Sequence, residues 1–143
     1  MTIETNTKYI LLVEDNPDDV TLTRIALRRG GILTRMEVAC DGAEALDFLF
    51  CRGKFIDRDF TEKPAIILLD LNLPRVSGLD VLKQVRADNG TSVIPVIVLT
   101  SSEEESDQTE TSRLGANDYI HKPTDLSTFV EVLKKIEVNW LLR

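Results

Sequence analysis

The chain has 143 residues, 43% of them hydrophobic, and its 17 basic and 24 acidic side chains give a formal net charge of −7. This length suits one hydrophobic core, so we expect residues 1–143 to form a single domain. The acidic balance argues against nucleic acid or an anionic membrane surface as a partner, because both attract clusters of Lys and Arg.

The sequence also carries little sign of export or of metal-binding cysteines. Residues 1–7 are polar, and no apolar run approaches the roughly 20 residues of a membrane helix, which predicts a cytoplasmic protein. Cys40 and Cys51 lack the neighbouring Cys or His residues of a disulfide framework or a zinc site. We therefore interpret both cysteines as free thiols.

Five segments have the pattern of strands. Residues 9–13, 65–69 and 96–99 are short, continuous apolar runs, typical of parallel strands that are covered on both faces. Residues 35–39 alternate in polarity and residues 119–120 are short, which favours strands nearer the sheet edges. The sequence therefore predicts a five-stranded sheet.

Helical patterns separate these strands. The predicted helices are residues 17–29, 43–51, 79–87, 103–113 and 125 to about 142. Asn16 can cap the first helix and Pro17 suits its first position. Ser102 is the expected cap of the fourth helix, which has almost no apolar stripe and should be loosely held. This alternation predicts an α/β sandwich with right-handed crossovers.

The last helix carries two sets of apolar residues. We expect one face to be buried, with Leu126, Phe129, Val130, Leu133, Ile136 and Trp140. We expect a second set to lie off this stripe and to form an exposed apolar patch, with Val132, Val138, Leu141 and Leu142. Such a patch predicts a homodimer; the alternative is a tail that folds back as additional core.

Polar residues follow four of the five predicted strands. The residues at these strand ends are Glu14, Asp15, Asp70, Thr100 and Lys122. The carboxyl ends of parallel strands meet at one edge of a sheet, so we expect these side chains to converge. Three crowded carboxylates repel one another unless a cation joins them, and hard oxygen ligands suit Mg²⁺ or Mn²⁺.

Asp70 is the candidate nucleophile of this cluster. Leu69 and Leu71 flank it, so its carboxylate would project from an apolar wall toward an incoming phosphoryl group. Lys122 and Thr100 could then bond the phosphoryl oxygens. Each residue alone is more simply a helix cap or a solvated charge, and only the joint pattern indicates a site.

These residues resemble the receiver domain of response regulators in two-component signalling. The segments that carry the resemblance are LLVEDN (11–16), ILLDLNLP (67–74), SG (77–78), VLTS (98–101), GA (115–116) and YIHKP (119–123). The match spans residues 8 to about 138. It implies a flavodoxin-like (βα)5 three-layer sandwich with strand order 2-1-3-4-5 and no output domain. It also implies that Asp70 accepts phosphate from a sensor histidine kinase.

The resemblance assigns further roles by position. Asp15, Asp70 and the backbone carbonyl of Asn72 would bind the metal, Glu14 would act mostly through water, and Lys122 would contact the phosphoryl group. Thr100 and Tyr119 would form the switch between two packings. Glu14 stands where many relatives have Asp, but Glu is also common in the family and is compatible with metal contact through water. Thr124 stands where an aromatic residue is frequent, which predicts looser packing at the start of the last helix.

Within that family, the chain most resembles the small stand-alone regulators paired with bacterial and cyanobacterial phytochrome kinases. The long connector at residues 52–64 and the run at residues 71–75 carry this resemblance. The expected output is protein contact, through the fourth helix, the Tyr119 strand and the last helix, with an unidentified downstream partner. His121 is interpreted as structural or surface-lining rather than as a phosphorelay residue.

Three other functions share parts of this pattern. A Mg²⁺-dependent phosphatase with an aspartyl nucleophile commonly has a second Asp two residues further on, where this chain has Asn72. A flavin-binding protein would need glycines or hydroxyls in the acidic turn at residues 14–18. A pseudo-receiver would keep the fold without being phosphorylated. We therefore expect a phosphoryl acceptor rather than an enzyme.

Overall fold

The computed structural model describes residues 8–102 and 104–142 of the chain. All five predicted strands and all five predicted helices are present. In chain order the elements are β1 (Tyr9–Val13), α1 (Pro17–Arg29), β2 (Arg35–Ala39), α2 (Gly42–Leu49), η1 (Gly53–Phe55), β3 (Ile66–Leu69), α3 (Gly78–Ala87), β4 (Val96–Thr100), α4 (Glu105–Arg113), β5 (Asp118–His121), α5 (Leu126–Ile136) and η2 (Glu137–Leu141). No helix within these described ranges is long and apolar enough to cross a membrane.

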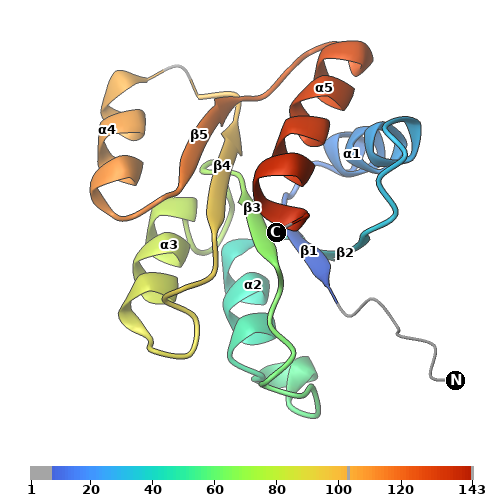
Figure 1. Ribbon diagram of the computed structural model, residues 1–143. Coiled ribbons are helices and arrows are strands. Elements are labelled where there is room, and N and C mark those ends of the chain that lie inside the picture. Colours follow the sequence, from blue (N-terminus) through green and yellow to red (C-terminus); the bar gives the residue numbers. More distant parts are fainter. Residues whose placement is uncertain (1–7, 103, 143) are drawn as a thin grey trace, which may run out of the picture.

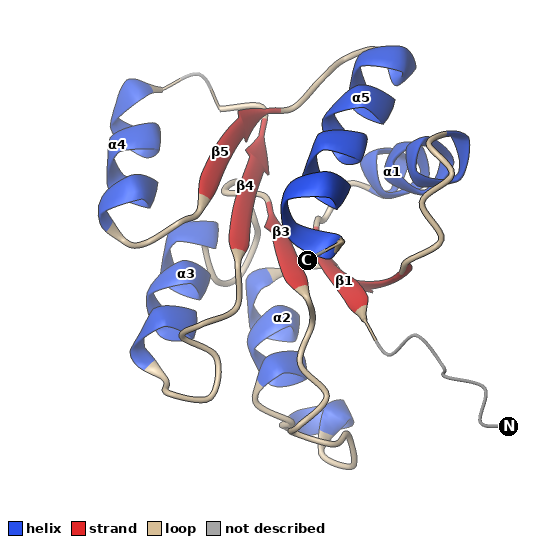
Figure 2. Ribbon diagram, in the orientation of Figure 1, coloured by secondary structure: helices blue, strands red, loops and turns tan. Residues whose placement is uncertain are grey.

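The strands form one parallel sheet between two helical layers. The sheet order is β2-β1-β3-β4-β5, and every neighbouring pair is parallel. Figures 1 and 2 show α1 and α5 on one face of this sheet and α2, α3 and α4 on the other. This is the predicted flavodoxin-like three-layer sandwich, with the predicted strand order.

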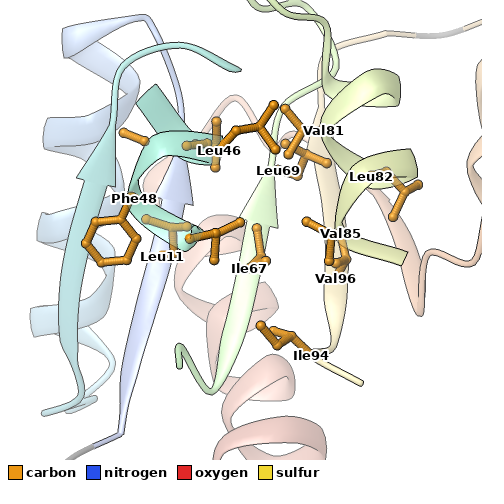
Figure 3. Close-up of a cluster of buried hydrophobic side chains, with 14 of the residues drawn as sticks. Leu11, Leu46, Phe48, Ile67, Leu69, Val81, Leu82, Val85, Ile94 and Val96 are labelled. Atoms are coloured by element: carbon orange, nitrogen blue, oxygen red, sulfur yellow. The ribbon is translucent and has the colours of Figure 1, made fainter. Parts of the chain in front are cut away.

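The sheet separates two hydrophobic cores. Successive strand residues point to opposite faces, so Leu11 and Val13 contribute to the core under α2 and α3, shown in Figure 3. Ile10 and Leu12 contribute to the core under α1 and α5. All residues of β1, β3 and β4 are buried. These three strands therefore form a rigid support for the residues at their carboxyl ends.

Helix α1 begins where the sequence predicts. Asn16 Oδ1 accepts a hydrogen bond from the Asp18 backbone N–H at 2.9 Å, and Pro17 is the first helical residue. Asp18 and Asp19 lie in the first turn, where negative charge is favourable because of the helix dipole. Only three residues separate β1 from α1, so this acidic turn lies beside the carboxyl end of the strand.

The end of the chain corrects one part of the sequence prediction. After α5 the backbone widens into a π-helical turn, η2, in which the Leu142 N–H donates to the Glu137 carbonyl at 3.0 Å. This wider turn rotates Leu141 inward, where it is 5% exposed and joins the core under α1 and α5. The prediction that Leu141 is exposed is therefore wrong.

One further residue of the predicted patch, Val132, also makes it smaller than expected. Val132 is half-buried and packs against the same core, so its assignment to an exposed patch is also wrong. Val138 and Leu142 are exposed, as predicted. Lys8 Nζ donates to the Leu141 carbonyl at 3.0 Å and ties the tail to the beginning of β1. Part of the tail thus extends the core, while two apolar side chains remain on the surface.

Helix α4 also begins differently from the prediction. Its cap is Glu104, whose side chain makes no capping hydrogen bond, and the predicted first residue, 103, lies outside the described residues. Ser102 Oγ instead donates to Asp107 Oδ2 at 2.6 Å. Thr111 is the one buried residue that α4 contains. The helix is as polar as predicted, so it has little apolar packing to hold it in place.

The connector before β3 is held by Arg58. Arg58 Nε donates to the Phe48 carbonyl at 2.9 Å, and one of its terminal nitrogens donates to the Glu62 carbonyl at 2.7 Å. The Tyr9 hydroxyl donates to the same Glu62 carbonyl at 2.6 Å. This cluster lies where β1 begins, so it anchors the connector at the opposite sheet edge from the acidic residues.

Candidate functional site

The predicted site residues converge at the carboxyl edge of the sheet. Glu14 and Asp15 directly follow β1, Asp70 directly follows β3, and Thr100 is the last residue of β4. Lys122 directly follows β5, and its N–H donates to the Thr100 carbonyl at 2.8 Å. Parallel pairing with nearly aligned strand ends therefore brings four separate chain segments together.

Three carboxylates form an acidic triad. Glu14, Asp15 and Asp70 each offer one oxygen, and these atoms all lie within 4.8 Å of one another. Glu14 and Asp70 are buried, whereas Asp15 is exposed, so the triad opens to solvent on one side. Hard oxygen donors with room for water fit Mg²⁺ or Mn²⁺ better than a softer metal.

The Lys122 ammonium lies against this triad. Nζ donates to Glu14 Oε1 at 2.6 Å, to Asp19 Oδ2 at 2.9 Å and to Asp70 Oδ2 at 3.1 Å. Burial alone would lower the pKa of Lys122, but the hydrogen bonds to Glu14 and Asp19 and the charge of Asp70 outweigh it and raise the pKa above its usual value. The lysine therefore carries its positive charge at physiological pH.

Burial raises the pKa of Glu14 above its usual value. Its pKa is raised mainly because the carboxyl group is removed from water, while the hydrogen bonds from Lys122 and from the Asn16 backbone oppose this effect. The second oxygen of Glu14 accepts from the Asn16 N–H at 3.2 Å. Glu14 thus faces both the lysine and the first turn of α1.

The Asp70 carboxylate is held in one orientation by its neighbours. Its Oδ1 accepts from Thr100 Oγ1 at 2.9 Å and from the Asn72 N–H at 3.1 Å, while Oδ2 faces Lys122. Thr100 is fully buried. A Cβ at Gly78 would lie 2.4 Å from the Asp70 carbonyl oxygen, so the close approach of α3 requires glycine there.

Asn72 contacts Asp70 directly, whereas Tyr119 contacts Ser102. Asn72 is exposed at the rim of the triad, where its backbone already contacts Asp70. Tyr119 is half-buried, and its hydroxyl donates to the Ser102 carbonyl at 3.2 Å. Tyr119 lines an open surface pocket of about 220 Å³ against α4 and a second open pocket of about 320 Å³ that His121 also lines. The exposed His121 is therefore surface-lining, as the sequence suggests.

A continuous hydrogen-bonded path joins Asp70 to Tyr119. Thr100 Oγ1 donates to Asp70 and accepts from the Ser102 N–H at 3.3 Å. The Ser102 carbonyl in turn accepts from Tyr119. The two residues predicted to form a switch are thus joined through one intervening residue.

Asp19 is a site residue that sequence reasoning missed. Its acidic character alone suggested only a favourable charge at the start of α1. Its contact with Lys122 joins the first turn of α1 to the residue that follows β5, so no local spacing in the sequence indicates it.

Comparison with known proteins gives one family. Residues 10–134 match the family model described as the response regulator receiver domain. The chain is 35% identical over 134 residues to response regulator Rcp1 of Synechocystis sp., a match that covers 94% of this chain and 89% of Rcp1.

Solved structures agree with that match. The phosphorylated cyanobacterial phytochrome response regulator RcpA superposes with a TM-score of 0.85 at 37% identity, over 94% of each chain. The Mn²⁺-bound form of Rcp1 superposes with a TM-score of 0.81 at 35% identity, over 91% of each chain. One of these relatives is thus a phosphorylated protein and the other binds a divalent metal.

Proposed function

Because this chain belongs to the response regulator receiver domain family, we propose that it accepts a phosphoryl group on Asp70 from a sensor histidine kinase. The observation that carries this proposal is the Asp70 carboxylate, which lies between the acidic triad, the Thr100 hydroxyl and the Lys122 ammonium. A nucleophile, a cation site and two hydrogen-bond donors are the groups that phosphoryl transfer requires.

In the proposed reaction an Asp70 oxygen attacks phosphorus, and the bond between phosphorus and the donor's imidazole nitrogen breaks. Lys122 supports the transfer by balancing the negative charge of the phosphoryl oxygens. Thr100 supports it by donating a hydrogen bond from its hydroxyl to one of these oxygens. Glu14, Asp15, Asp70 and the Asn72 backbone carbonyl would hold Mg²⁺ or Mn²⁺, which neutralises negative charge at the acceptor. The remaining contacts of Asp70 keep its carboxylate in place.

We propose that the signal then leaves through Tyr119 and α4. When Thr100 bonds to a phosphoryl oxygen, its hydrogen bonds to Asp70 and Ser102 change, and Ser102 passes the change to the Tyr119 hydroxyl. The two surface pockets that Tyr119 lines leave space for a second packing of this residue. Since α4 has little apolar packing, a small change at Tyr119 is sufficient to shift it.

The relatives support a phytochrome pathway for this proposal. A regulator named Rcp1 and the phytochrome regulator RcpA cover nearly the whole chain, which supports a phytochrome-type kinase as the phosphodonor. In this proposal residues 1–143 act as one receiver domain in the cytoplasm and signal by protein contacts. The protein is a phosphoryl acceptor with slow self-dephosphorylation and not an enzyme, since the exposed Asn72 amide is not a general acid.

The test is the intact mass of the protein after incubation with Mg²⁺ and acetyl phosphate, for the wild type and for Asp70→Asn. A single phosphoryl adduct on the wild type only, removed by hydroxylamine, would support an aspartyl phosphate. If neither acetyl phosphate nor a histidine kinase gave an adduct, the pseudo-receiver interpretation would replace this one. Sustained release of phosphate from many phosphoesters would instead indicate a phosphatase.

A further inference from the structure

Asp19 lies outside the acidic triad but shares its lysine. Lys122 Nζ lies 2.9 Å from Asp19 Oδ2 and 3.1 Å from Asp70 Oδ2. The triad itself consists of Glu14, Asp15 and Asp70. Of the carboxylates that Lys122 contacts in the described parts of the chain, only Asp19 is neither a triad member nor the proposed acceptor.

The hydrogen-bonding capacity of Lys122 is fully used. An ammonium group has three N–H donors, and Glu14, Asp19 and Asp70 accept one each. A phosphoryl oxygen can bond to Lys122 only by replacing one of these carboxylates. A cation in the triad, in turn, repels the ammonium and drives it toward the carboxylate that does not contact the metal. Both events therefore depend on how firmly Asp19 holds the lysine.

Asp19 is itself well placed to hold it. The residue is in the first turn of α1, and its backbone carbonyl accepts a hydrogen bond from Thr23 Oγ1 at 2.7 Å. Its side chain is 29% exposed, against 11% for Lys122. This contact therefore joins a fixed helical turn to the residue that follows β5.

We propose that Asp19 is a positioning residue that holds the Lys122 ammonium toward α1. It thereby favours a divalent cation in the triad and competes with the phosphoryl group for the lysine. The second effect rests on the proposed function of Asp70, whereas the first does not.

The chain offers a matched control in Asp18. Asp18 and Asp19 are adjacent, and both lie in the first turn of α1, so each experiences the same helix dipole. Asp18 is exposed. Replacement of either residue by Asn removes one negative charge, but only Asp19→Asn removes one of the three carboxylates that contact Lys122.

The experiment measures Mg²⁺ binding by calorimetry and then, at saturating Mg²⁺, the binding of beryllium fluoride by ¹⁹F NMR. Beryllium fluoride is the probe because it mimics a phosphoryl group without a covalent step. For Asp19→Asn we expect the dissociation constant for Mg²⁺ to rise about fivefold and that for beryllium fluoride to fall by a similar factor. Asp18→Asn should change each by less than about twofold, and Asp19→Glu should restore wild-type values.

A Lys122→Met background completes the test. If Asp19 acts through the lysine, then in the Lys122→Met background Asp19→Asn should change the dissociation constant for Mg²⁺ no more than Asp18→Asn does. Equal shifts for the two Asn variants in the wild-type background, or an Asp19 effect that persists without Lys122, would overturn the inference. The two proposals can also fail separately. If the wild type gained no phosphoryl adduct but Asp19→Asn alone weakened Mg²⁺ binding, the proposed function of Asp70 would be wrong. The inference that Asp19 favours a cation in the triad would still be supported.

Discussion

The hydroxyl of Thr100 lies 2.9 Å from Asp70 Oδ1 and is fully buried, so the acceptor and the first residue of the hydrogen-bonded path are already in contact. Thr100→Val keeps the side-chain shape but removes this donor. We expect the variant to be phosphorylated on Asp70 but to leave α4 unchanged. Amide chemical shifts of α4, compared with and without beryllium fluoride and Mg²⁺, measure the effect.

The control for that experiment is Thr100→Ser, which keeps the hydroxyl and should still shift α4. Loss of the Thr100 hydrogen bond should also lower the free energy of unfolding of the valine variant by about 1–3 kcal/mol. A valine variant whose α4 responds like the wild type would show that the signal does not travel through Thr100.

Lys122→Met should make stability depend on metal. Without the ammonium, Glu14, Asp19 and Asp70 lose the positive charge that all three contact. We expect the metal-free variant to lose about 2–4 kcal/mol of unfolding free energy. Mg²⁺ should restore more of this stability than it adds to the wild type. Urea unfolding with EDTA and with Mg²⁺ provides the measurement, and equal stabilisation of the two proteins by Mg²⁺ would contradict it.

Gly78→Ala should destabilise the protein at the acceptor. The added Cβ would lie 2.4 Å from the Asp70 carbonyl oxygen and 2.7 Å from Leu71 Cα, both of them backbone atoms that cannot turn away. We expect a loss of about 2–4 kcal/mol in unfolding free energy and slower phosphorylation. Gly90→Ala is the control, because its Cβ would meet the movable ring of Phe60. Similar losses for both variants would argue against a special role for the contact at Asp70.

Tyr9 should make the protein less stable at alkaline pH. Burial raises the pKa of Tyr9 above its usual value of 10.0, although the charges of Arg58 and Arg35 oppose this effect. A raised pKa in the folded state means that stability is fully present below pH 10.0 and is lost as pH rises toward the folded-state pKa. Tyr9→Phe should show a smaller loss between about pH 9 and about pH 11 in urea unfolding. An unchanged slope would contradict this assignment.

The exposed tail residues allow a test of the predicted homodimer. Val138 and Leu142 are 62% and 68% exposed, and with Leu141 buried they carry what remains of the predicted patch. If the wild type dimerises through this end, Val138→Glu with Leu142→Glu should yield a monomer in sedimentation at micromolar concentration. Leu33→Glu, at a residue that is 95% exposed in the loop between α1 and β2, should leave the dimer intact. If the wild type is a monomer at this concentration, the predicted homodimer is wrong.

Most of the site could be predicted because parallel strands convert sequence position into spatial position. Glu14, Asp70 and Lys122 each follow a short strand, and the register of the sheet aligns these ends. Apolar runs mark the strands unambiguously where both faces are covered, as in β1, β3 and β4. The roles assigned to these residues remain predictions.

The errors arose where local geometry departs from the regular repeat. The sequence pattern of the last helix assumed 3.6 residues per turn, and the π-helical turn at η2 moved Leu141 inward. Ser102 had an alternative partner in Asp107, which no local pattern distinguishes from a helix cap. Asp19 was missed because its contact with Lys122 joins residues 103 positions apart.

The sheet that divides the hydrophobic interior in two also bears on how such a chain can change over evolutionary time. Leu11 and Ile10 are adjacent in sequence yet pack into different cores. Substitutions whose side chains share no neighbours have nearly additive effects on stability. Mutations beneath α2 and α3 can therefore accumulate without compensation beneath α1 and α5. A lineage could in this way acquire new recognition on one side of the sheet while the other side stays under its earlier selection.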